Sequence, residues 1–482
     1  MFALQNFIDG KLQDALSGEW LDNIEPATGK VYSRIPRSGA ADVNQAVDAA
    51  KRAFPSWAAT PIEERSACLL RLAASVAAHA EDWAVAEARD NGKPVALAKE
   101  VDMMRSERNL AFFATAIQHF ASEAHIPSGP THINYTHRKP IGVVGCISPW
   151  NLPLYLFTWK VAPALATGNC VVAKPSEVTP MTAYLLSTCI EAAGFPPGVF
   201  NIVHGLGPEA GEAIVTHPDI KALSFTGGTT TGAHIQRATA GTFKKLSLEL
   251  GGKNAAIVFA DANLEKALRT TVRSSFANQG QICLCSSRIL IERSVYEEFR
   301  DRLVEKASRM TPGDPLADGT KMGAVVSETH RDKILAAIDR AVADGGRILV
   351  GGSSAPAPND RCANGYFVQP TIIEGVPVAC DLNQQEVFGP VISLLPFDTE
   401  EEALALANST DYGLSATLWT QDLQRAHRVA AQVETGIVWV NCWLVRDLRT
   451  PFGGVKSSGV GREGGFEALR FFTEPQNVCI EL

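Results

Sequence analysis

The chain has 482 residues, of which 46% are hydrophobic and 20% charged, and its formal net charge is −8. This composition is typical of an ordinary globular protein with material for about two or three domains. The acidic balance, without a long Lys/Arg run, argues against nucleic acid and anionic membranes as partners. The ten scattered cysteines and a start without the basic-then-apolar order of a secretory signal predict a reduced, cytoplasmic protein.

Residues 40–123 predict helices, because apolar residues recur there at spacings of three and four. After this segment, short apolar runs such as GVVGCIS and CVVAKP alternate with helical stretches. This alternation predicts an α/β fold with parallel sheets covered by helices on both faces. It continues as far as RILVGG, residues 347–352, so we expect two α/β units with separate cores and a boundary near Leu250.

Two strand-like segments lie outside both units. They are HINYTHRKP, residues 132–140, and the tail FFTEPQNVCIEL. Strands without a sheet of their own often pair with another chain. We therefore expect these segments to pair across subunits and to build a homodimer or a homotetramer.

Two stretches resemble parts of a dinucleotide site. In SFTGGTTTG, residues 224–232, an apolar run leads through glycines into a helix, an arrangement that favours phosphate binding. The G-x-G-x-x-G fingerprint is missing, so a glycine turn that binds nothing is an equal alternative. Lys174 and Glu177 close the run CVVAKP and can hydrogen-bond ribose hydroxyls, while the Glu177 charge would repel a 2′-phosphate. On this segment alone, two solvated loop charges are as good an interpretation.

Three residues are candidates for catalysis. Glu249 lies between leucines, and a carboxylate in apolar surroundings acquires a raised pKa that suits a general base. Asn151 lies in the proline-bounded turn SPWNLP, where a rigid amide can donate to an oxyanion. Taken separately, a solvent-facing Glu249 and a turn-capping Asn151 are the favoured local alternatives. In NQGQICLC, Cys283 follows a polar run that suits a nucleophilic thiolate, whereas Cys285 lies further into an apparent strand.

The cysteine pair has other interpretations. A zinc site needs a second pair or nearby histidines, and a bridge between cysteines two apart is strained. Either both thiols are therefore inert or one of them is the nucleophile.

Seven motifs in order resemble the aldehyde dehydrogenase superfamily. They are SPWNLP, AKPSE, FTGGTTTG, LELGGKN, NQGQICLC, EVFGP and PFGGVKSSGVGRE. The resemblance implies two Rossmann-like parallel-sheet domains and a small β extension for oligomerisation. The implied division is residues 1–121 and 139–250 for NAD binding, 251–450 for catalysis, and 122–138 and 466–482 for oligomerisation.

The resemblance also implies roles for single residues. Cys283 matches the nucleophile, Glu249 the general base and Asn151 the oxyanion donor. The residues that it places around NAD are Ser148, Trp150, Lys174, Ser176, Glu177, Gly207, Phe225, Gly227, Gly228, Thr231, Leu250, Glu386 and Phe388. No metal is implied. Gly228 departs from the family, since many members have serine there, and a hydroxyl contact to the pyrophosphate would be lost.

The implied reaction is oxidation of an aldehyde to an acid through a cysteine thioester. Cys283 attacks the carbonyl, a hydride passes to the nicotinamide, and Glu249 activates the water that releases the acid. A carboxylate at position 249 favours hydrolysis over transfer to coenzyme A. A non-catalytic structural role, known in this family, is disfavoured because both nucleophile and base are present.

The substrate prediction depends on NCWLVRDLRTPFGG. Arg446 lies six residues before Phe452, at a position that lines the substrate tunnel in the family, and Arg105 belongs to a segment at the tunnel entrance. An arginine there is expensive to bury unless it meets an anion. The sequence most resembles semialdehyde dehydrogenases that act on 2-aminomuconate and 2-hydroxymuconate semialdehydes in aromatic catabolism. Alternatives are a broad-range enzyme for uncharged aldehydes, another semialdehyde, or arginines paired with nearby carboxylates such as Asp447.

Overall fold

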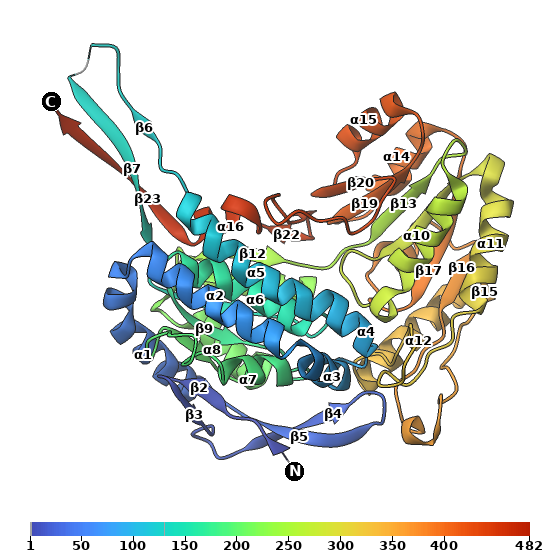
Figure 1. Ribbon diagram of the computed structural model, residues 1–482. Coiled ribbons are helices and arrows are strands. Elements are labelled where there is room, and N and C mark those ends of the chain that lie inside the picture. Colours follow the sequence, from blue (N-terminus) through green and yellow to red (C-terminus); the bar gives the residue numbers. More distant parts are fainter. Residues whose placement is uncertain (1, 130) are drawn as a thin grey trace.

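The computed structural model describes residues 2–129 and 131–482, so Met1 and Pro130, which belong to two of the predicted segments, lie outside the described residues. Two lobes face each other, and an arm projects from one of them (Figure 1). The first lobe is built on an eight-stranded sheet in the order β22-β12-β11-β8-β9-β10-β2-β3. Its strands are β2 (Asn6–Ile8), β3 (Lys11–Gln13), β8 (Val143–Ile147), β9 (Cys170–Lys174), β10 (Phe200–Ile202), β11 (Ile220–Thr226), β12 (Lys245–Glu249) and β22 (Gly459–Val460).

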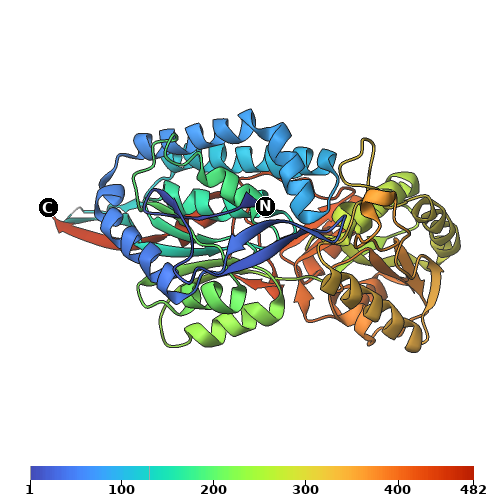
Figure 2. The same ribbon diagram turned by 90° about the horizontal axis from the view of Figure 1, so that it is seen from below.

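The five central strands of this sheet, β12 to β10, are parallel, and β2, β3 and β22 add antiparallel edges. Strand β9 is buried along its whole length, as expected for a parallel strand covered on both faces. Helices lie on both sides of the sheet (Figure 2). They are α1 (Ala40–Ala59), α2 (Ile62–Ala78), α3 (Ala80–Asn91), α4 (Val95–Leu97), the π-helix η1 (Ala98–Met103), α5 (Met104–Ala116), α6 (Pro153–Ala166), α7 (Met181–Ser187), α8 (Glu212–Thr216), α9 (Thr229–Thr239) and α16 (Gly465–Phe471).

The second lobe contains a seven-stranded sheet in the order β15-β16-β17-β14-β13-β19-β20. Its strands are β13 (Asn254–Val258), β14 (Ser286–Glu292), β15 (Arg347–Val350), β16 (Thr371–Glu374), β17 (Val391–Phe397), β19 (Ser415–Trp419) and β20 (Ile437–Val440). Its helices are α10 (Leu264–Phe276), α11 (Tyr296–Ser308), α12 (Glu328–Ala343), α13 (Asp381–Gln384), α14 (Glu400–Asn408) and α15 (Leu423–Gln432). The α/β fold class is confirmed, and the boundary expected near Leu250 falls between β12 and β13.

Three details differ from the sequence prediction. Strand β15, expected within the parallel alternation, is an antiparallel edge strand. No strands were predicted in the first forty residues, but these residues contribute β2 and β3 to the eight-stranded sheet. They also contain β1 (Phe2–Ala3), β4 (Trp20–Glu25) and β5 (Lys30–Pro36), and these three strands form a separate sheet. Residues 143–166 form β8, a loop and the buried helix α6, a helix that the sequence analysis did not predict.

The two segments predicted to lie outside both units form the arm. Strand β7 (His132–Pro140) pairs antiparallel with β23 (Thr473–Glu481), and β6 (Ala124–His125) adds to the other side of β7. The two long strands are thus each other's partners within one chain, which the sequence did not predict. Residues 466–471 of the predicted tail segment belong to α16 instead. Within residues 2–129 and 131–482, no helix has the length and apolar character needed to cross a bilayer.

Candidate active site

Cys283 lies between α10 and β14, after a left-handed turn. Asn278, Gln279 and Gly280 have φ values of 51°, 57° and 71°, a conformation that costs energy in residues with side chains. Side-chain amides hold the turn, since Gln279 donates to the Ala324 carbonyl at 2.9 Å and Asn278 donates to the Gln281 carbonyl at 3.2 Å. At Gly280 a Cβ would lie 2.1 Å from the Gly389 carbonyl oxygen, so only glycine fits.

The two cysteines differ in access. Cys283 is partly exposed and lines three pockets, of which the two larger are described below. Cys285 is buried, lines only the smallest of the three, and its thiol lies 3.9 Å from the Ala277 carbonyl oxygen. Burial raises the pKa of Cys285 to about 12. Burial also raises the pKa of Cys283, and the Glu386 and Glu249 carboxylates add to this effect, while Arg446 opposes it.

Asn151 lies at the carboxyl end of β8, where the loop Ser148–Leu152 precedes α6. Its side chain is buried, and its Nδ2 donates to the Gln281 carbonyl at 3.0 Å. The amide therefore does not cap a turn, and it belongs to the lining of the same pocket as Cys283. One amide hydrogen is engaged by Gln281, which leaves the second for a ligand.

Glu249 ends β12 and is 4% exposed, so the solvent-facing alternative is wrong. Its Oε1 has no hydrogen-bond partner in the described part of the chain, and this carboxylate lines the pocket on one side of Cys283. Burial raises the pKa of Glu249 well above its usual value, and the Glu463 carboxylate adds to the rise. Glu463 is itself held by the Lys160 ammonium at 2.8 Å.

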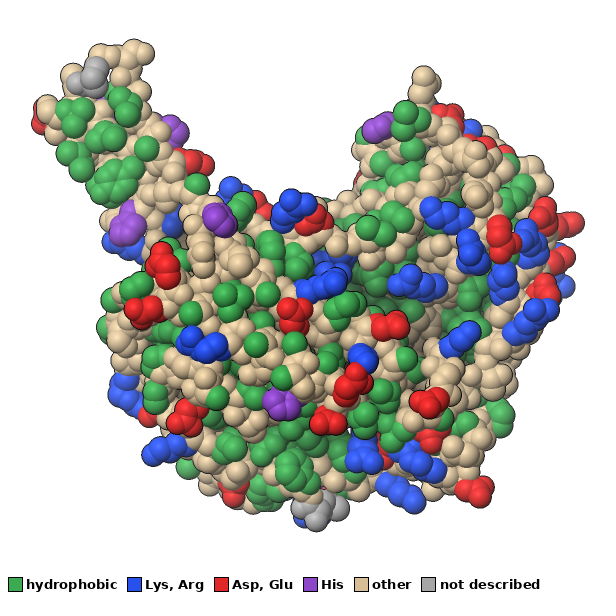
Figure 3. Space-filling model, viewed as in Figure 1, with side chains coloured by type: hydrophobic (Ala, Val, Ile, Leu, Met, Phe, Trp, Pro, Cys, Tyr) green, Lys and Arg blue, Asp and Glu red, His purple; other side chains and the backbone are tan. Residues whose placement is uncertain are grey.

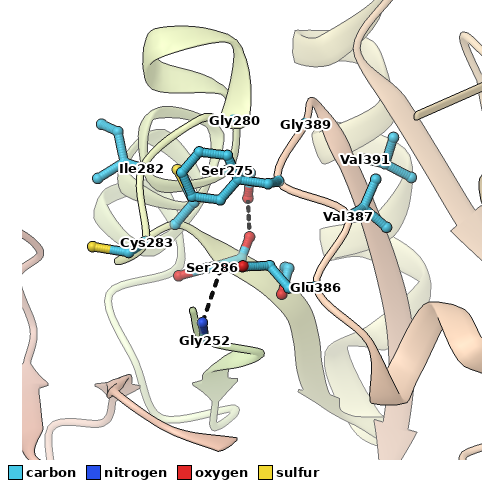
Figure 4. Close-up of a pocket in the computed structure, with 13 residues that line it drawn as sticks. Gly252, Ser275, Gly280, Ile282, Cys283, Ser286, Glu386, Val387, Gly389 and Val391 are labelled. Atoms are coloured by element: carbon cyan, nitrogen blue, oxygen red, sulfur yellow. Dashed lines mark hydrogen bonds between the residues drawn. The ribbon is translucent and has the colours of Figure 1, made fainter. Parts of the chain in front are cut away.

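Glu386 belongs to the same lobe as Cys283 and lines two of the same pockets. Its Oε1 accepts a hydrogen bond of 2.9 Å from the Gly252 backbone N–H (Figure 4). In the same view, the Cys283 side chain is directed away from Glu386. Burial raises the pKa of Glu386 to about 7, although the Gly252 hydrogen bond opposes the rise. A Cβ at Gly251 would lie 2.2 Å from the Glu386 carboxylate, so glycine is needed for this close approach.

One of the two larger pockets contains part of the predicted cofactor set. The predicted residues that line it are Trp150, Gly227, Gly228, Leu250, Glu386 and Phe388. The Trp150 and Phe388 rings meet edge to face at 5.2 Å. His330 and Lys333 of α12 also line this pocket and were not found from the sequence. The His330 ring packs against Trp150 at 5.1 Å, and its Nε2 lies 2.8 Å from the Phe388 carbonyl oxygen. Burial lowers the pKa of His330 to about 4.

Other predicted cofactor residues gather at the end of β9. The buried Lys174 ammonium donates to Glu177 at 2.9 Å, and Glu177 accepts a long hydrogen bond of 3.4 Å from the Gly207 N–H. The alternative of two solvated charges is therefore wrong for Lys174. Ser148 hydrogen-bonds to the Lys174 carbonyl through its N–H, and its buried hydroxyl has no partner among the described residues.

Further residues of the predicted cofactor set lie near the ends of β9 and β11 and at the start of α9. Gly228 is the N-cap of α9 and offers no side chain to cap it, and Thr231 lies in the first turn. The Phe225 ring packs so closely on Gly227 that a Cβ there would lie 2.4 Å from it. Ser176 accepts a hydrogen bond of 3.4 Å from the Val178 N–H.

The pocket on the other side of Cys283 is rich in arginine. It combines Glu249, Phe452, Tyr155 and Leu284 with four arginines, namely Arg105, Arg108, Arg273 and Arg446. Figure 3 shows Lys and Arg side chains gathered where the surface is hollowed between the lobes. Arg105 and Arg108 both belong to α5 and both line the pocket. Arg273 was not predicted, because only the fold brings α10 to this wall.

Arg446 is held without a carboxylate. Its Nη1 donates to the Tyr155 hydroxyl at 2.7 Å, and its guanidinium carbon lies 4.0 Å from the centre of the Phe452 ring. Its buried Nη2 has no hydrogen-bond partner among the described residues. Asp447 instead pairs with Arg449, at 2.6 Å, so the predicted alternative of an Arg446–Asp447 pair is wrong.

Arg105, like Arg446, has no carboxylate partner among the described residues. Within the described ranges it forms no ion pair with Glu100, Glu107 or another carboxylate, and its guanidinium carbon lies 5.8 Å from the centre of the Tyr155 ring. Burial lowers the pKa of Arg105, and the neighbouring Arg446 and Arg108 charges add to this, whereas Tyr155 opposes it. Two half-buried guanidiniums, one over the Tyr155 ring and one hydrogen-bonded to its hydroxyl, therefore line the pocket without an ion-pair partner among the described residues. Among the described residues, no group of His, Cys, Asp and Glu is placed to hold a metal ion.

The chain belongs to the aldehyde dehydrogenase family, whose model matches residues 13–478. It is 50% identical over 479 residues to the 2-aminomuconic semialdehyde dehydrogenase of Danio rerio, covering 99% of this chain and 98% of that one. It is 46% identical over 487 residues to the 2-hydroxymuconic semialdehyde dehydrogenase of Pseudomonas sp. (strain CF600), with both chains fully covered. An NAD+ complex of the aldehyde dehydrogenase from Bacillus cereus superposes with a TM-score of 0.96 at 38% identity, covering 100% of this chain and 97% of that one. The predicted family resemblance is confirmed.

Proposed function

We propose that this protein oxidises an aldehyde that carries a carboxylate, with NAD as the oxidant, and that 2-aminomuconic or 2-hydroxymuconic semialdehyde is its substrate. The names of the relatives suggest these two compounds. The observation that carries the acidic substrate is Arg446, whose Nη2 is buried at the pocket without an acceptor. A substrate carboxylate would satisfy it and neutralise the neighbouring Arg105.

The residues present fit a dinucleotide. Lys174, Glu177 and Gly207 offer donors and acceptors for one ribose, and Glu386 offers an acceptor for the other. The start of α9 lacks a side-chain cap and so leaves backbone N–H groups for the pyrophosphate. When bound, NAD would supply the hydride acceptor. This support leads us to retain residues 1–121 and 139–250 as the NAD-binding domain and residues 251–450 as the catalytic domain.

The roles of the chain's own residues follow from their positions. The Cys283 sulfur attacks the aldehyde carbon, and the free hydrogen of the Asn151 amide, with backbone N–H, holds the oxygen that becomes negative. After oxidation the acyl group stays on Cys283 as a thioester. Glu249 takes a proton from water, the water oxygen attacks the thioester carbon, and the thiolate of Cys283 leaves with release of the acid.

Replacing Arg446 with alanine should selectively impair acidic substrates. The loss of a charged hydrogen-bond partner costs about 1.5–3 kcal/mol, which corresponds to about a ten- to hundredfold fall in kcat/KM. The assay compares 2-hydroxymuconic semialdehyde with benzaldehyde on the same preparation. Arg449→Ala, which removes the neighbouring arginine that Asp447 holds, is the matched control. Equal losses on both aldehydes would make Arg446 a structural residue and refute the acidic substrate.

NAD should be preferred over NADP. Burial acts to raise the pKa of Glu177, but the Lys174 ammonium and the hydrogen bonds to the carboxylate outweigh it and lower this pKa. The carboxylate is therefore charged at neutral pH, and like charges brought together cost several kcal/mol. We expect kcat/KM for NAD to exceed that for NADP by on the order of 100-fold. Glu177→Gln should reduce the ratio of kcat/KM for NAD to kcat/KM for NADP. A wild-type preference for NADP would refute the role assigned to Glu177.

The arm supports assembly into a homodimer or a homotetramer. Strand β23 is the outer strand of the order β23-β7-β6, and it leaves a row of backbone groups for another chain. Exposed apolar side chains on the arm, Tyr135 and Ile480 among them, add surface to bury. Light scattering at micromolar concentration should give the mass of two or four chains, and a stable monomer would contradict the proposal.

The ten free thiols fit a reducing compartment, and we propose that the protein is located in the cytoplasm.

A further inference from the structure

Three side chains donate hydrogen bonds to the backbone carbonyl oxygen of Asn151. The Lys93 ammonium donates to it at 3.0 Å, the Asn278 amide at 2.9 Å and the Asn91 amide at 3.4 Å. Asn91 also donates to the Trp150 carbonyl at 2.8 Å. The loop that carries the proposed oxyanion donor is therefore fixed through its main chain, and the Asn151 side chain remains directed at the pocket.

Lys93 forms a fully buried ion pair. Its Nζ lies 2.6 Å from Oδ2 of Asp102, and both side chains are 0% exposed. Gly92, which ends α3 with a φ of 86°, turns the chain so that Lys93 points inward. Burying two charges is expensive unless the geometry is very good. Glu87 lies beside the pair and accepts a hydrogen bond of 3.3 Å from the Leu154 N–H, and burial, then Asp102, raise the pKa of Glu87 well above its usual value.

The partner of Lys93 lies in the helical turn that forms part of the arginine-rich pocket's wall. Asp102 lies in the π-helix η1, and π-helical turns are rare and frequent at functional sites. Glu100 and Val101 of the same turn line the arginine-rich pocket, and Met104 and Arg105 follow directly. The ion pair thus joins the wall that carries Arg105 to the loop that carries Asn151.

We propose that Lys93 is a positioning residue, whose ion pair with Asp102 holds the Asn151 oxyanion donor in register with the substrate-binding wall. The proposal rests on the role proposed above for Asn151. Lys93 is fully buried and lines none of the pockets at Cys283, so in this proposal it acts through the Asn151 main chain. A shift of the donor by about 1 Å can lower a rate by about a hundredfold.

The test removes both charges together. In the double variant Lys93→Met/Asp102→Leu, an apolar pair replaces the ion pair, a change that buried ion pairs often tolerate without loss of stability. We expect kcat for aldehyde oxidation to fall by about 10- to 100-fold. Hydrolysis of p-nitrophenyl acetate, which also forms an oxyanion but needs no hydride transfer, should fall by the same factor. The dissociation constant for NAD and the rate of Cys283 alkylation by iodoacetamide should stay within about twofold.

The control variant is Lys244→Met. Lys244 also donates to two backbone carbonyls, those of Val215 and His217, each at 2.7 Å, but it lines none of the pockets at Cys283. It should leave both activities unchanged. If the double variant does not fold, Asp102→Asn keeps the shape and removes the charge that anchors Lys93, and it should lower both activities together.

Two results would overturn the inference. One is a folded double variant, or a folded Asp102→Asn protein, with both activities within twofold of wild type. The other is a parallel loss of NAD binding and Cys283 alkylation, which would show general disruption. Asn151→Ala separates this inference from the proposed function. If that variant loses both activities while the Lys93 variants do not, only the positioning role fails, and if it loses neither, the oxyanion role of Asn151 fails as well.

Discussion

Cys283→Ala is expected to abolish aldehyde oxidation while leaving NAD binding nearly intact. The thiol is the side-chain nucleophile that forms the proposed thioester, and removing such a nucleophile lowers the rate by about 10⁶-fold in comparable covalent mechanisms. The alanine keeps the Cβ and removes only the sulfur, so the left-handed turn before it is undisturbed. Steady-state NADH formation and a titration of bound NAD are the two measurements.

The neighbouring thiol provides the matched control. Cys285 is buried and turned toward the Ala277 carbonyl, so Cys285→Ala should keep most of the activity. The small cavity that it leaves costs about 1 kcal/mol of stability, which thermal unfolding would register without a change in kcat. An active Cys283→Ala protein, or an inactive Cys285→Ala protein that still folds, would contradict the assignment of Cys283 as the nucleophile.

Glu249→Gln is expected to arrest the reaction after the thioester has formed. Glutamine preserves the shape of the buried side chain but cannot take a proton from water, and loss of a general base lowers a rate by about 10²–10⁴-fold. Rapid mixing with NAD and aldehyde should give a burst of NADH near one equivalent per active site, followed by slow turnover. A variant without a burst, or one with full turnover, would contradict the role of Glu249.

The pH dependence separates the base from the nucleophile. Burial chiefly raises the pKa of Glu249, and a base works only when deprotonated, so wild-type kcat should increase as the pH rises through that raised value. Burial likewise raises the pKa of Cys283, so the burst rate should also increase with pH. In Glu249→Gln the increase in turnover attributable to the base should disappear, while the increase in the burst rate persists.

Much of the architecture was predictable from local pattern. Runs such as CVVAK, which becomes β9, are apolar throughout because a central parallel strand is covered on both faces. Spacings of three and four residues predicted α1 and α2 because one side of each helix packs on the core. The order of the seven motifs predicted the aldehyde dehydrogenase family, which the match over residues 13–478 confirms.

Short strands and edge strands were harder to predict. Strand β15 has the composition of its parallel neighbours, and its direction depends on the path that the chain takes back to the sheet. Three of the strands before residue 40 are only two or three residues long, too short for a period of two to stand out. The pairing of β7 with β23 joins residues more than 300 positions apart, which no local pattern encodes.

By itself, the sequence predicted which residues carry the chemistry, because Cys283, Glu249 and Asn151 each lie in a motif with a distinct residue order. Only the tertiary structure decided how these groups are charged and supported. Burial sets the raised pKa of Glu249, the Arg446 guanidinium finds Tyr155 and Phe452 rather than Asp447, and His330 and Arg273 reach the site from other elements. The physical reason is that desolvation and ion pairing depend on which side chains surround a group in space, and those neighbours come from distant parts of the chain.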